Sequence, residues 1–510
     1  MEKRKVSRFA VPFICVLVIA LLASACSSSN SEGGTEPSAS SAASSASAST
    51  PPTVTALMFK TTDFPEDNPV IQEIRKRSGI NLQVQTVSQG DYETRLNTLL
   101  VSGAVPDIFT ASKTKIQELI ANGALLPLDE LIEENAPNIK ENRGDYLKGG
   151  AYVDGKAYGI PEGFAPGSAL AIRKDWLDKL NLPVPTNLEE YENTLRAFVN
   201  DDPDNNGQKD TIGVGLAISV DQSWEHIFGA YNVPLGRPVL VDGKVTPWML
   251  APGYLDAVKY LNKLYQEGLM DPEFATVPNL QSYEKLWNGK IGAYNFNADG
   301  ITQNWLSRYV EPEVPQFEYT VIKGPDGHGG YLNPNVADST RYTVISSGAK
   351  DPVAAIKMLD FLVSKEGDAL TWAGVEGSQY KYENGEFQWI SPYEDAVKLR
   401  DAGGYMYSVL LNRMNGMRES LFNEQTKQGR QLAADNIIEE VHIFAMPQIE
   451  IDRGTILKDM EKEFRTKAIM AKGNVEELYE GFKKQYLSEG GSDWIEQATK
   501  IYNDEKAALQ

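Results

Sequence analysis

The sequence predicts an α/β protein with mainly parallel sheets flanked by helices, and three observations support this. Between residues 54 and 108, apolar segments of strand length alternate with amphipathic segments of helix length, the order of repeated strand–helix–strand units. The chain has 510 residues, and the about 455 that follow its amino-terminal region suffice for two or three domain-sized units. Its 2 cysteines are Cys15 and Cys26, so the fold must rest on a hydrophobic core and not on disulfides.

The amino-terminal segment, residues 1–25, has the pattern of an export signal. Basic residues at positions 3, 4, 5 and 8 precede an apolar run over residues 9–22, which is too short for a stop-transfer helix. Small residues then lead into Cys26, in a phrase (Leu-Leu-Ala-Ser-Ala-Cys) that resembles a bacterial lipobox. We therefore predict that Cys26 is lipidated and holds the protein at the outer face of the cytoplasmic membrane, as on a Gram-positive-like cell surface. An ordinary signal peptide, cut at the Ala-x-Ala pattern, would instead leave Cys26 as a free thiol.

Residues 26–52 are mostly Ser, Ala, Gly, Thr and Pro and have no large apolar side chain. Such a segment cannot bury enough surface to order itself, so we expect a flexible tether. The formal net charge of the chain is −21, which makes it a poor partner for nucleic acid and for an anionic membrane surface. No basic cluster and no second apolar span follows residue 22, so the membrane contact that we expect is the lipid alone.

The elements of the first half follow from the hydrophobic pattern. Strands are expected at residues 54–59 and 80–87, and helices at 70–77 and 91–100. A second group of elements begins near Ile172, where a strand leads into a short helix that stops before Pro183.

Further elements follow along the chain. The next helix has one apolar face, formed by Leu188, Tyr191, Leu195 and Phe198. Beyond it we expect a helix over residues 254–268, a strand over 289–297 and a proline-capped helix over 351–367. The remainder to residue 510 has a helical pattern.

The loop after residue 200 has the alternating oxygen ligands of a calcium loop. The expected ligands follow the spacing of an EF-hand loop and are Asp202, Asp204, Asn206, Gln208 (through its backbone carbonyl) and Asp210. Gly207 stands where such loops turn sharply, whereas Gly213 stands where an EF-hand places its bidentate glutamate. We predict one structural Ca²⁺ here; the alternative is an Asx-rich turn with solvated charges.

The region 172–213, with its Lys-Asp-Trp-Leu helix and Asp-Pro-Asp-x-Asn-Gly-x-x-Asp loop, resembles extracellular solute-binding proteins of carbohydrate ABC importers. The phrases at 102–108 (Ser-Gly-x-x-Pro-Asp-Ile), 122–129 and 154–161 (Asp-Gly-Lys-Ala-Tyr-Gly-Ile-Pro) are similar to phrases of the same family. The resemblance is greatest to the large lipoprotein group that binds oligosaccharides and includes the alginate-binding proteins. It implies a two-lobe, periplasmic-binding-protein-like fold of type II, with crossing segments as a hinge.

The resemblance also implies how the chain divides between the lobes. The amino-terminal lobe would contain residues 53–164 and 322–372, and the carboxy-terminal lobe 165–321 and 373–510. Such a protein captures an oligosaccharide between its lobes and delivers it to the transmembrane subunits of an ABC permease. It acts as a monomer and is not an enzyme.

The expected ligand contacts lie at the crossings and at strand ends. Aromatic faces stack on sugar rings, while carboxylates, amides and arginines bond the hydroxyls. On this basis the candidate contacts are Glu162, Phe164, Trp224, Asn295, Asn297, Trp305, Arg341 and Trp372. Each aromatic residue has an alternative role as core. Trp176 and Trp494, on expected helices, are predicted to be core residues.

Other functions stay open at this stage. The histidines, His226, His328 and His442, lack the spacing of a zinc site, and no Gly-x-Ser-x-Gly phrase is present. A secreted glycosidase remains an alternative, because any two of the 70 acidic residues could meet in the fold. A sugar sensor that feeds a membrane receptor, a peptide-binding protein of the same fold and a surface adhesin are further alternatives.

Replacing the predicted lipid attachment site tests the anchor. In the Cys26→Ala variant we expect the protein to be shed into the medium, because the acylated thiol is the only membrane contact that the sequence predicts. Fractionation of cells and medium measures this, with Cys15→Ala, inside the signal, as the matched control that should stay anchored. A Cys26→Ala protein that remains as membrane-bound as the parent would contradict the prediction.

Overall fold

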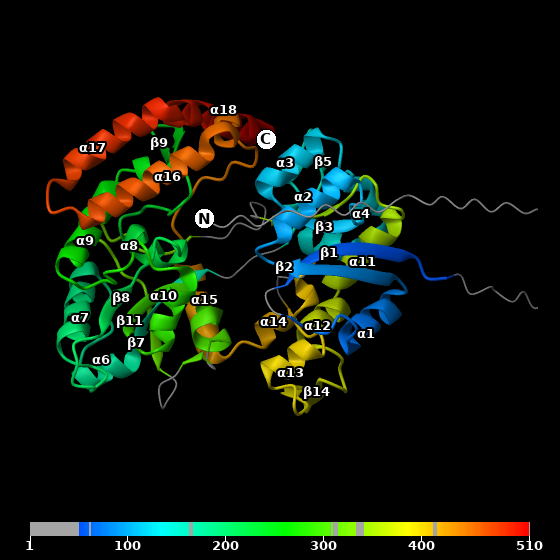
Figure 1. The fold of residues 1–510 in the computed structure, drawn as a ribbon, viewed down its shortest axis with the longest axis horizontal. Coiled ribbons are helices and arrows are strands. Elements are labelled where there is room, and N and C mark those ends of the chain that lie inside the picture. Colours follow the sequence, from blue (N-terminus) through cyan, green and yellow to red (C-terminus); the bar gives the residue numbers. More distant parts are fainter. Residues whose placement is uncertain are drawn as a thin grey trace, which may run out of the picture. The chain divides into compact units, whose positions relative to one another are not determined.

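The computed structural model describes residues 50–60, 63–162, 167–305, 308–309, 315–332, 341–411 and 416–508. Internal contacts divide the chain after Thr50, and residues 51–510 form one compact unit. The predictions for residues 1–25, for Cys26 and for Phe164 lie outside the described residues. Within the compact unit the α/β class is confirmed (Figure 1).

The first sheet has five strands in the order β2-β1-β3-β13-β6. Its strands are β1 (Thr53–Lys60), β2 (Asn81–Ser88), β3 (Ile108–Ser112), β6 (Ile160–Pro161) and β13 (Arg341–Ile345). Strand β1 pairs in parallel with β2 and β3, whereas β13 is antiparallel to both of its neighbours. Strand β13 therefore returns from far along the chain into the interior of the sheet.

Helices cover both faces of this sheet, and β1 shows why its sequence is almost continuously apolar. Val54 and Met58 lie in one core cluster, while Leu57 and Phe59 lie in another, because successive side chains point to opposite faces. The surrounding helices are α1 (Pro69–Ser78), α2 (Tyr92–Ser102), α3 (Lys113–Ala121), α4 (Asp129–Asn135), α5 (Pro137–Arg143), α11 (Pro352–Val363) and α12 (Lys365–Ala373).

The second sheet has four strands in the order β12-β7-β11-β8. They are β7 (Ser168–Arg173), β8 (Ile212–Gly215), β11 (Ile291–Asn297) and β12 (Phe317–Thr320). Only β11 and β8 run in parallel. Both sheets are thus mixed and not mainly parallel as predicted. The difference arises because β7, β12 and β13 flank the points where the chain crosses between the sheets, so they run against their neighbours.

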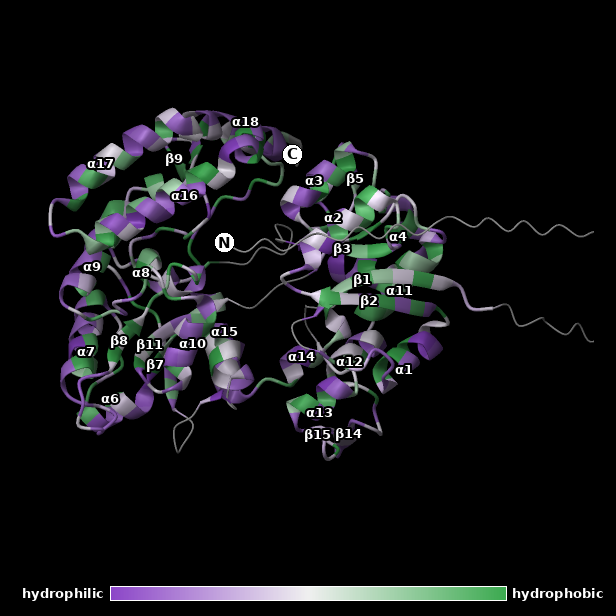
Figure 2. Ribbon diagram, viewed as in Figure 1, coloured by the Kyte–Doolittle hydropathy of each residue, from purple (hydrophilic) through white to green (hydrophobic). Residues whose placement is uncertain are grey.

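Another set of helices builds a large core around the second sheet. They are α6 (Lys174–Leu180), α7 (Leu188–Asn200), α8 (Glu225–Ala230), α9 (Tyr254–Gln266), α10 (Asn279–Trp287), α15 (Glu424–Asp435), α16 (Gln448–Met470), α17 (Val475–Tyr486) and α18 (Ser492–Ala508). The apolar face predicted for α7 is buried in this core, and so is Trp176. Helices α7 and α17 alternate between hydrophilic and hydrophobic colours along their length (Figure 2).

The remaining elements are small. Short hairpins are formed by β4 (Tyr152–Val153) with β5 (Lys156–Ala157), β9 (Val239–Val241) with β10 (Lys244–Thr246), and β14 (Tyr380–Glu383) with β15 (Glu386–Trp389). Helices α13 (Ala396–Asp401) and α14 (Met417–Ser420) follow the last hairpin. Among the described residues, no helix is both long and apolar enough to cross a membrane.

One stretch differs from the predicted division of the chain. We predicted that residues 373–510 belong with the second sheet, but Met406, Tyr407 and Leu410 lie in the core of the first. Tyr407 accepts a hydrogen bond from Asn68 Nδ2 at 2.7 Å, so this stretch is fixed to the helix α1 that begins beside Asn68. The carboxy-terminal helices α16 and α17 do pack around the second sheet. The other lobe boundaries stay predictions.

Candidate functional site

The segment after β12 is tied to two other parts of the chain through Tyr331. Its hydroxyl donates to the Thr320 carbonyl at 2.5 Å and accepts from the Leu170 N–H at 3.0 Å. Its backbone bonds Asn436 and Ile438 on either side, with distances of 2.9 Å each. Tyr331 thereby fixes the segment 436–438 against the start of the second sheet.

Buried polar side chains gather at this point. Ser168, the first residue of β7, donates a short hydrogen bond to the carboxyl of Glu225 on α8, and both residues are buried. Burial raises the pKa of Glu225 to about 8, and the charges of Glu440 and Asp221 act in the same direction. Glu225 is therefore a carboxyl group that stays largely protonated up to neutral pH.

Glu440 continues this cluster toward the carboxy-terminal helices. Its Oε1 lies 3.1 Å from His442 Nε2, and its Oε2 lies 3.9 Å from Arg237 Nε. The side chain of Glu440 is only 3% exposed. The Val441 N–H donates to the Pro238 carbonyl at 3.0 Å, which keeps this segment beside Arg237. We call Ser168, Glu225, Arg237, Glu440 and His442 the crossing cluster.

The end of β11 brings two predicted contacts to the same region. Asn297 pairs with Ser168 in the register of β11 and β7, so it lies beside the crossing cluster, and it is partly exposed. Asn295 is fully buried, and its Nδ2 donates to the Gln222 carbonyl at 2.7 Å. Its Oδ1 has no hydrogen-bond partner among the described residues. Because Asn295 is 0% exposed, a ligand hydroxyl does not reach this oxygen in the described structure.

Trp372 is connected to the end of β11 through Arg418. The Arg418 guanidinium lies 5.1 Å from the ring centre of Trp372 and bonds Asp299 Oδ2 at 2.5 Å. Asp299 is buried, and within the described part of the chain its Oδ1 has no hydrogen-bond partner. The arrangement places one carboxylate, one guanidinium and one partly exposed indole together.

Trp305 belongs to a group of partly exposed aromatic rings. It stacks on Phe296 with ring centres 4.8 Å apart and lies 4.9 Å from Tyr283. Phe296 is on β11 between Asn295 and Asn297, so this group lies at the same end of the strand but on the opposite face of the sheet.

Glu162 and Arg341 lie together on the first sheet. The Glu162 N–H donates to the Arg341 carbonyl at 3.3 Å, and the Arg341 guanidinium lies 4.4 Å from the ring centre of Phe59. Burial raises the pKa of Tyr92 to about 12, with the charge of Glu162 adding to the rise and that of Arg341 opposing it. The two side chains are therefore close enough to the Tyr92 hydroxyl to act on it electrostatically.

Trp224 is a core residue in this structure. It is 0% exposed, its Nε1 donates to the Ala217 carbonyl at 2.7 Å, and its ring packs edge-on against Phe274. Full burial leaves no ring face for a sugar, so we do not retain Trp224 among the proposed contacts.

Several residues of the site were not predicted, namely Ser168, Glu225, Asp299, Arg418 and Glu440. Asp299 could have been found, because it follows Asn295 and Asn297 at the same spacing of two. Glu225 follows Trp224 directly, but nothing in the sequence indicates its burial. Arg418 and Glu440 come from segments without a recognisable motif.

The predicted calcium loop adopts a tight turn with positive φ at Asp202, Asn205 and Gly207. Asp202 accepts hydrogen bonds from the N–H groups of Asn206 and Gly207, at 3.1 and 3.0 Å. Asn206 Nδ2 donates to both Asp204 and Asp210, at 2.8 and 3.0 Å. The predicted ligands other than Gln208 therefore already converge through their side chains.

A cation also faces this loop. Lys290 Nζ lies 2.5 Å from Asp210 Oδ2 and 4.0 Å from Asp204 Oδ2. The hydrogen bond from Lys290 lowers the pKa of Asp210. Burial is the main cause that raises the pKa of Asp204, and the hydrogen bond with Asp202 raises it further. No group of three His, Cys, Asp or Glu side chains in the described ranges is arranged to hold a metal ion. The oxygen set, the turn and the buried Asp204 Oδ1 nevertheless fit a calcium ion.

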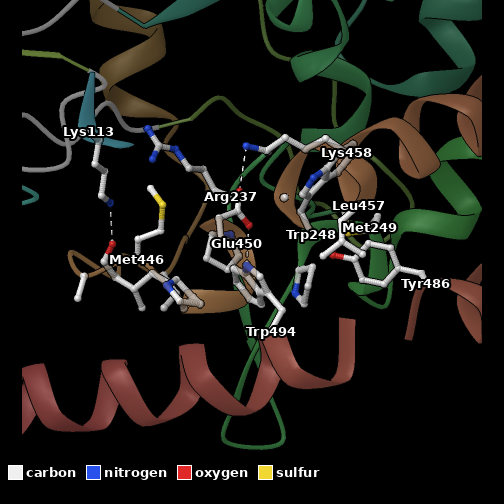
Figure 3. Close-up of a pocket in the computed structure, with 18 residues that line it drawn as sticks. Lys113, Arg237, Trp248, Met249, Met446, Glu450, Leu457, Lys458, Tyr486 and Trp494 are labelled. Carbon is white, nitrogen blue, oxygen red and sulfur yellow. Dashed lines mark hydrogen bonds and ion pairs between the residues drawn. The ribbon is translucent and has the colours of Figure 1, made fainter. Parts of the chain in front are cut away.

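A pocket of about 280 Å³ opens beside the crossing cluster. Its walls include Lys113 from the start of α3 and, from later in the chain, Arg237, Trp248, Glu450, Lys458 and Trp494. Figure 3 shows these side chains, with Lys113 bonded to the Ile443 carbonyl at 2.9 Å and Lys458 bonded to Glu450 at 3.0 Å. The pocket combines apolar walls with charged groups of both signs.

Two solved structures share this fold. That of the alginate-binding protein AlgQ2 without calcium ion has a TM-score of 0.70 at 20% identity, covering 89% of this chain and 98% of that one. That of the S. pneumoniae substrate-binding protein FusA, an EF-hand mutant in complex with fructo-nystose, has a TM-score of 0.69 at 20% identity, covering 89% and 100%. The likeness establishes the two-lobe α/β fold of a solute-binding protein.

The family follows from the sequence match. The profile of the bacterial extracellular solute-binding proteins matches residues 61–369, more than half of the chain. This chain therefore belongs to the bacterial extracellular solute-binding protein family, as the phrases in its sequence predicted.

Two curated relatives extend the similarity over most of the chain. Lipoprotein LipO of Bacillus subtilis is 23% identical over 465 residues, covering 86% of this chain and 90% of the relative. The polygalacturonan/rhamnogalacturonan-binding protein YtcQ of the same organism is 25% identical over 465 residues, covering 87% and 89%.

The buried carboxyl of Glu225 should make stability depend on pH. Its folded-state pKa of about 8 lies above the ordinary value of 4.5, so its contribution to the free energy of unfolding is complete below 4.5 and declines up to about 8. The parent should therefore lose stability between pH 5 and pH 8. In Glu225→Gln this loss should be smaller by on the order of 1 kcal/mol or more. Urea unfolding at both pH values measures this.

Glu189→Gln, which removes an exposed carboxylate on α7, is the matched control and should leave the pH dependence of the parent unchanged. The same pH dependence in Glu225→Gln as in the parent would contradict the burial of an un-ionised Glu225.

Proposed function

We propose that this protein captures an oligosaccharide between its two lobes and delivers it to the transmembrane subunits of an ABC importer. The observation that carries the proposal is the meeting of polar strand ends with partly exposed aromatic rings. Asn297 and the Phe296–Trp305 stack lie at the end of β11, and Arg418 lies beside Trp372 and bonds Asp299. Sugar hydroxyls and the apolar faces of sugar rings match these two kinds of group.

The names of related proteins support a carbohydrate ligand. YtcQ is a polygalacturonan/rhamnogalacturonan-binding protein, and FusA has been solved with an oligosaccharide. Binding without catalysis is consistent with a family of solute carriers, whose members hand over an unchanged ligand. We further propose that the protein acts as a monomer, that lipidated Cys26 holds it outside the cell, and that it has no nucleic-acid partner.

The crossing segments suggest how capture works. A ligand that touches both lobes favours the closed arrangement by its differential affinity for that state. Glu162 and Arg341 would supply contacts from the first lobe, and Asn297 and Trp305 from the second. Phe164, which is outside the described residues, belongs to the same proposed contact set. Closure expels water, so the polar bonds form in a drier site, and a permease can recognise the closed form.

Calorimetric titration with an oligosaccharide panel, followed by small-angle scattering, tests capture. A bound sugar should decrease the radius of gyration, because closure makes the protein more compact. Trp305→Ala should weaken binding by about 1–3 kcal/mol, the scale of one lost aromatic contact. Tyr265→Ala, which removes a partly exposed ring on α9, is the matched control and should bind normally.

Two outcomes would overturn the proposal. If a saturating ligand leaves the radius of gyration unchanged, the proposed closure of the lobes is wrong. The release of shorter sugars during incubation would show hydrolysis, and the glycosidase alternative would then replace transport.

We also propose that the loop from Asp202 to Asp210 binds one structural Ca²⁺. The side chains of Asp202, Asp204, Asn206 and Asp210 and the Gln208 carbonyl would hold the ion. Calcium sites also occur in similar structures, as the names of the AlgQ2 and FusA structures indicate. Ca²⁺ would replace the ammonium of Lys290 as the cation that neutralises Asp204 and Asp210.

Calcium added after thorough chelation should raise the melting temperature, since an ion that binds only the folded state stabilises it by mass action. Asp204→Ala should abolish this rise without changing sugar preference. Asp242→Ala, in the turn between β9 and β10, is the control and should keep the rise. A parent protein with no calcium-dependent shift and no metal by elemental analysis would contradict the site.

A further inference from the structure

The chain passes from the first lobe to the second between α14 and α15. The Met417 N–H on α14 donates to Asp368 Oδ2 on α12 at 2.8 Å, which fixes α14 to the first lobe. Gln425 Nε2 on α15 donates to the Phe317 carbonyl on β12 at 2.5 Å, which fixes α15 to the second sheet. Residues 421–423 therefore form a crossing segment between the lobes.

The second lobe holds this crossing segment. The Gln303 side chain donates to the Leu421 carbonyl at 3.1 Å and accepts from the Asn423 N–H at 2.9 Å. Asn423 Nδ2 donates in turn to the Thr302 carbonyl at 2.6 Å. Because Thr302 and Gln303 lie shortly after β11, the crossing segment moves with the second lobe. A change in the angle between the lobes must then occur at its junction with α14.

Two ion pairs span that junction. Arg418 Nη2 on α14 lies 2.5 Å from Asp299 Oδ2, which belongs to the second lobe. Next to it, Glu419 Oε1 on α14 lies 2.8 Å from Arg430 Nη2 on α15. The first lobe thus contributes the cation of one pair and the anion of the other. Together the two pairs favour the lobe angle of this structure.

Asp299 and Arg430 each have a buried atom that these pairs do not use. Asp299 is 3% exposed, and neither its Oδ1 nor Arg430 Nη1 has a hydrogen-bond partner among the described residues. Unpaired buried polar atoms are costly, so native proteins seldom contain them without a reason. Burial lowers the pKa of Arg430, and the charges of Glu419 and Asp299 oppose that shift, so Asp299 is within electrostatic reach of Arg430. Both residues belong to the second lobe, so a contact between them does not depend on the lobe angle.

We infer that Asp299 exchanges Arg418 for Arg430 when the lobe angle changes. Arg430 leaves Glu419 to reach Asp299, so one exchange opens both ion pairs that span the junction. The released Glu419 side chain is already 49% exposed and becomes hydrated. Asp299 has a guanidinium partner in both arrangements, which avoids the large cost of a buried charge without a partner.

The exchange keeps the two lobe angles close in free energy. Without Arg430, the separation of Arg418 from Asp299 would leave a buried carboxylate unpaired, and the pair would lock the lobes. A ligand shifts a conformational equilibrium only by its differential affinity for the two states, so a small difference between them makes the shift easier. The exchange is thus part of the lobe movement that the proposed function requires.

Melting temperatures of single and double variants of the mature chain test the exchange. Arg418→Gln and Arg430→Gln each leave Asp299 one guanidinium, so each should lower the melting temperature only modestly. The double variant leaves none, and its shift should be roughly twice the sum of the single shifts or more. In an Asp299→Asn background, which has no charge to neutralise, the same two substitutions should be additive.

Matched variants control for the loss of charge. Arg453 pairs with Glu489 within the carboxy-terminal helices, so Arg453→Gln combined with Arg418→Gln should give an additive shift. If the double variant at Arg418 and Arg430 fails to fold, Arg418→Gln with Arg430→Lys should still fold, because a lysine also neutralises Asp299. Additive shifts for Arg418→Gln and Arg430→Gln, or a failure of the lysine variant to fold, would overturn the exchange.

Distances between spin labels test the link to the lobe angle. Val101→Cys on α2 and Leu478→Cys on α17 place labels at exposed positions of the two lobes, in a Cys26→Ala chain without sugar. Arg418→Gln should lower the population at the main distance of the parent by about half or more, since both pairs across the junction are lost. Arg453→Gln should leave the distance distribution unchanged. The same distribution in Arg418→Gln as in the parent would overturn the inference.

Failure of the exchange differs from failure of sugar capture. Neither measurement contains a sugar, so additive shifts or unchanged distances would overturn the exchange and leave sugar capture unaffected. If the double variant is destabilised and the distances change as expected, but no sugar binds, the exchange holds and the proposed capture is wrong.

Discussion

The hydroxyl of Tyr331 holds together the part of the protein on which the site depends. It lies between the Leu170 N–H and the Thr320 carbonyl, at 3.0 and 2.5 Å, and so joins two neighbouring strands to the segment that follows them. The backbone of the same residue pairs with residues 436 and 438. Glu440, Val441 and Ile443 follow within a few residues, so the crossing cluster and one wall of the pocket depend on this single tyrosine.

Close backbone packing supports that arrangement. A Cβ on Gly330 would lie 2.3 Å from the Asn436 carbonyl oxygen, and one on Gly229 would lie 2.2 Å from the Gly330 carbonyl oxygen. Gly330 also has φ of +152°, a conformation that other residues rarely adopt. Helix α8 can therefore approach the crossing segment closely, which places Glu225 near enough to Glu440 for the charge of one to raise the pKa of the other.

Local patterns in the sequence predicted what depends on neighbouring residues. The apolar face of α7, the burial of Trp176 and the turn of the Asp202–Asp210 loop follow from spacing alone. The pairing of the strands could not be predicted in this way. Strand β13 pairs with β3 although more than two hundred residues separate them, and it runs antiparallel to β3. Trp224 was proposed as a contact because an aromatic residue in a loop resembles a sugar platform, but tertiary packing buried it. Arg418 and Glu440 reach the site only through the fold, so no pattern near them in the sequence could indicate their role.

The contact between Arg237 and Glu440 also bears on how a bound ligand would be released. A carrier that bound its ligand too tightly would not deliver it, because the free energy of binding must be offset when the ligand passes to the permease. Glu440 lies 3.9 Å from the Arg237 guanidinium and is only 3% exposed, so this arginine already has an internal counter-ion. The pocket beside the crossing cluster is thereby partly neutralised by the protein itself, and a departing ligand would leave no bare positive charge at Arg237. Reloading and unloading would then require little rearrangement of charge in the protein.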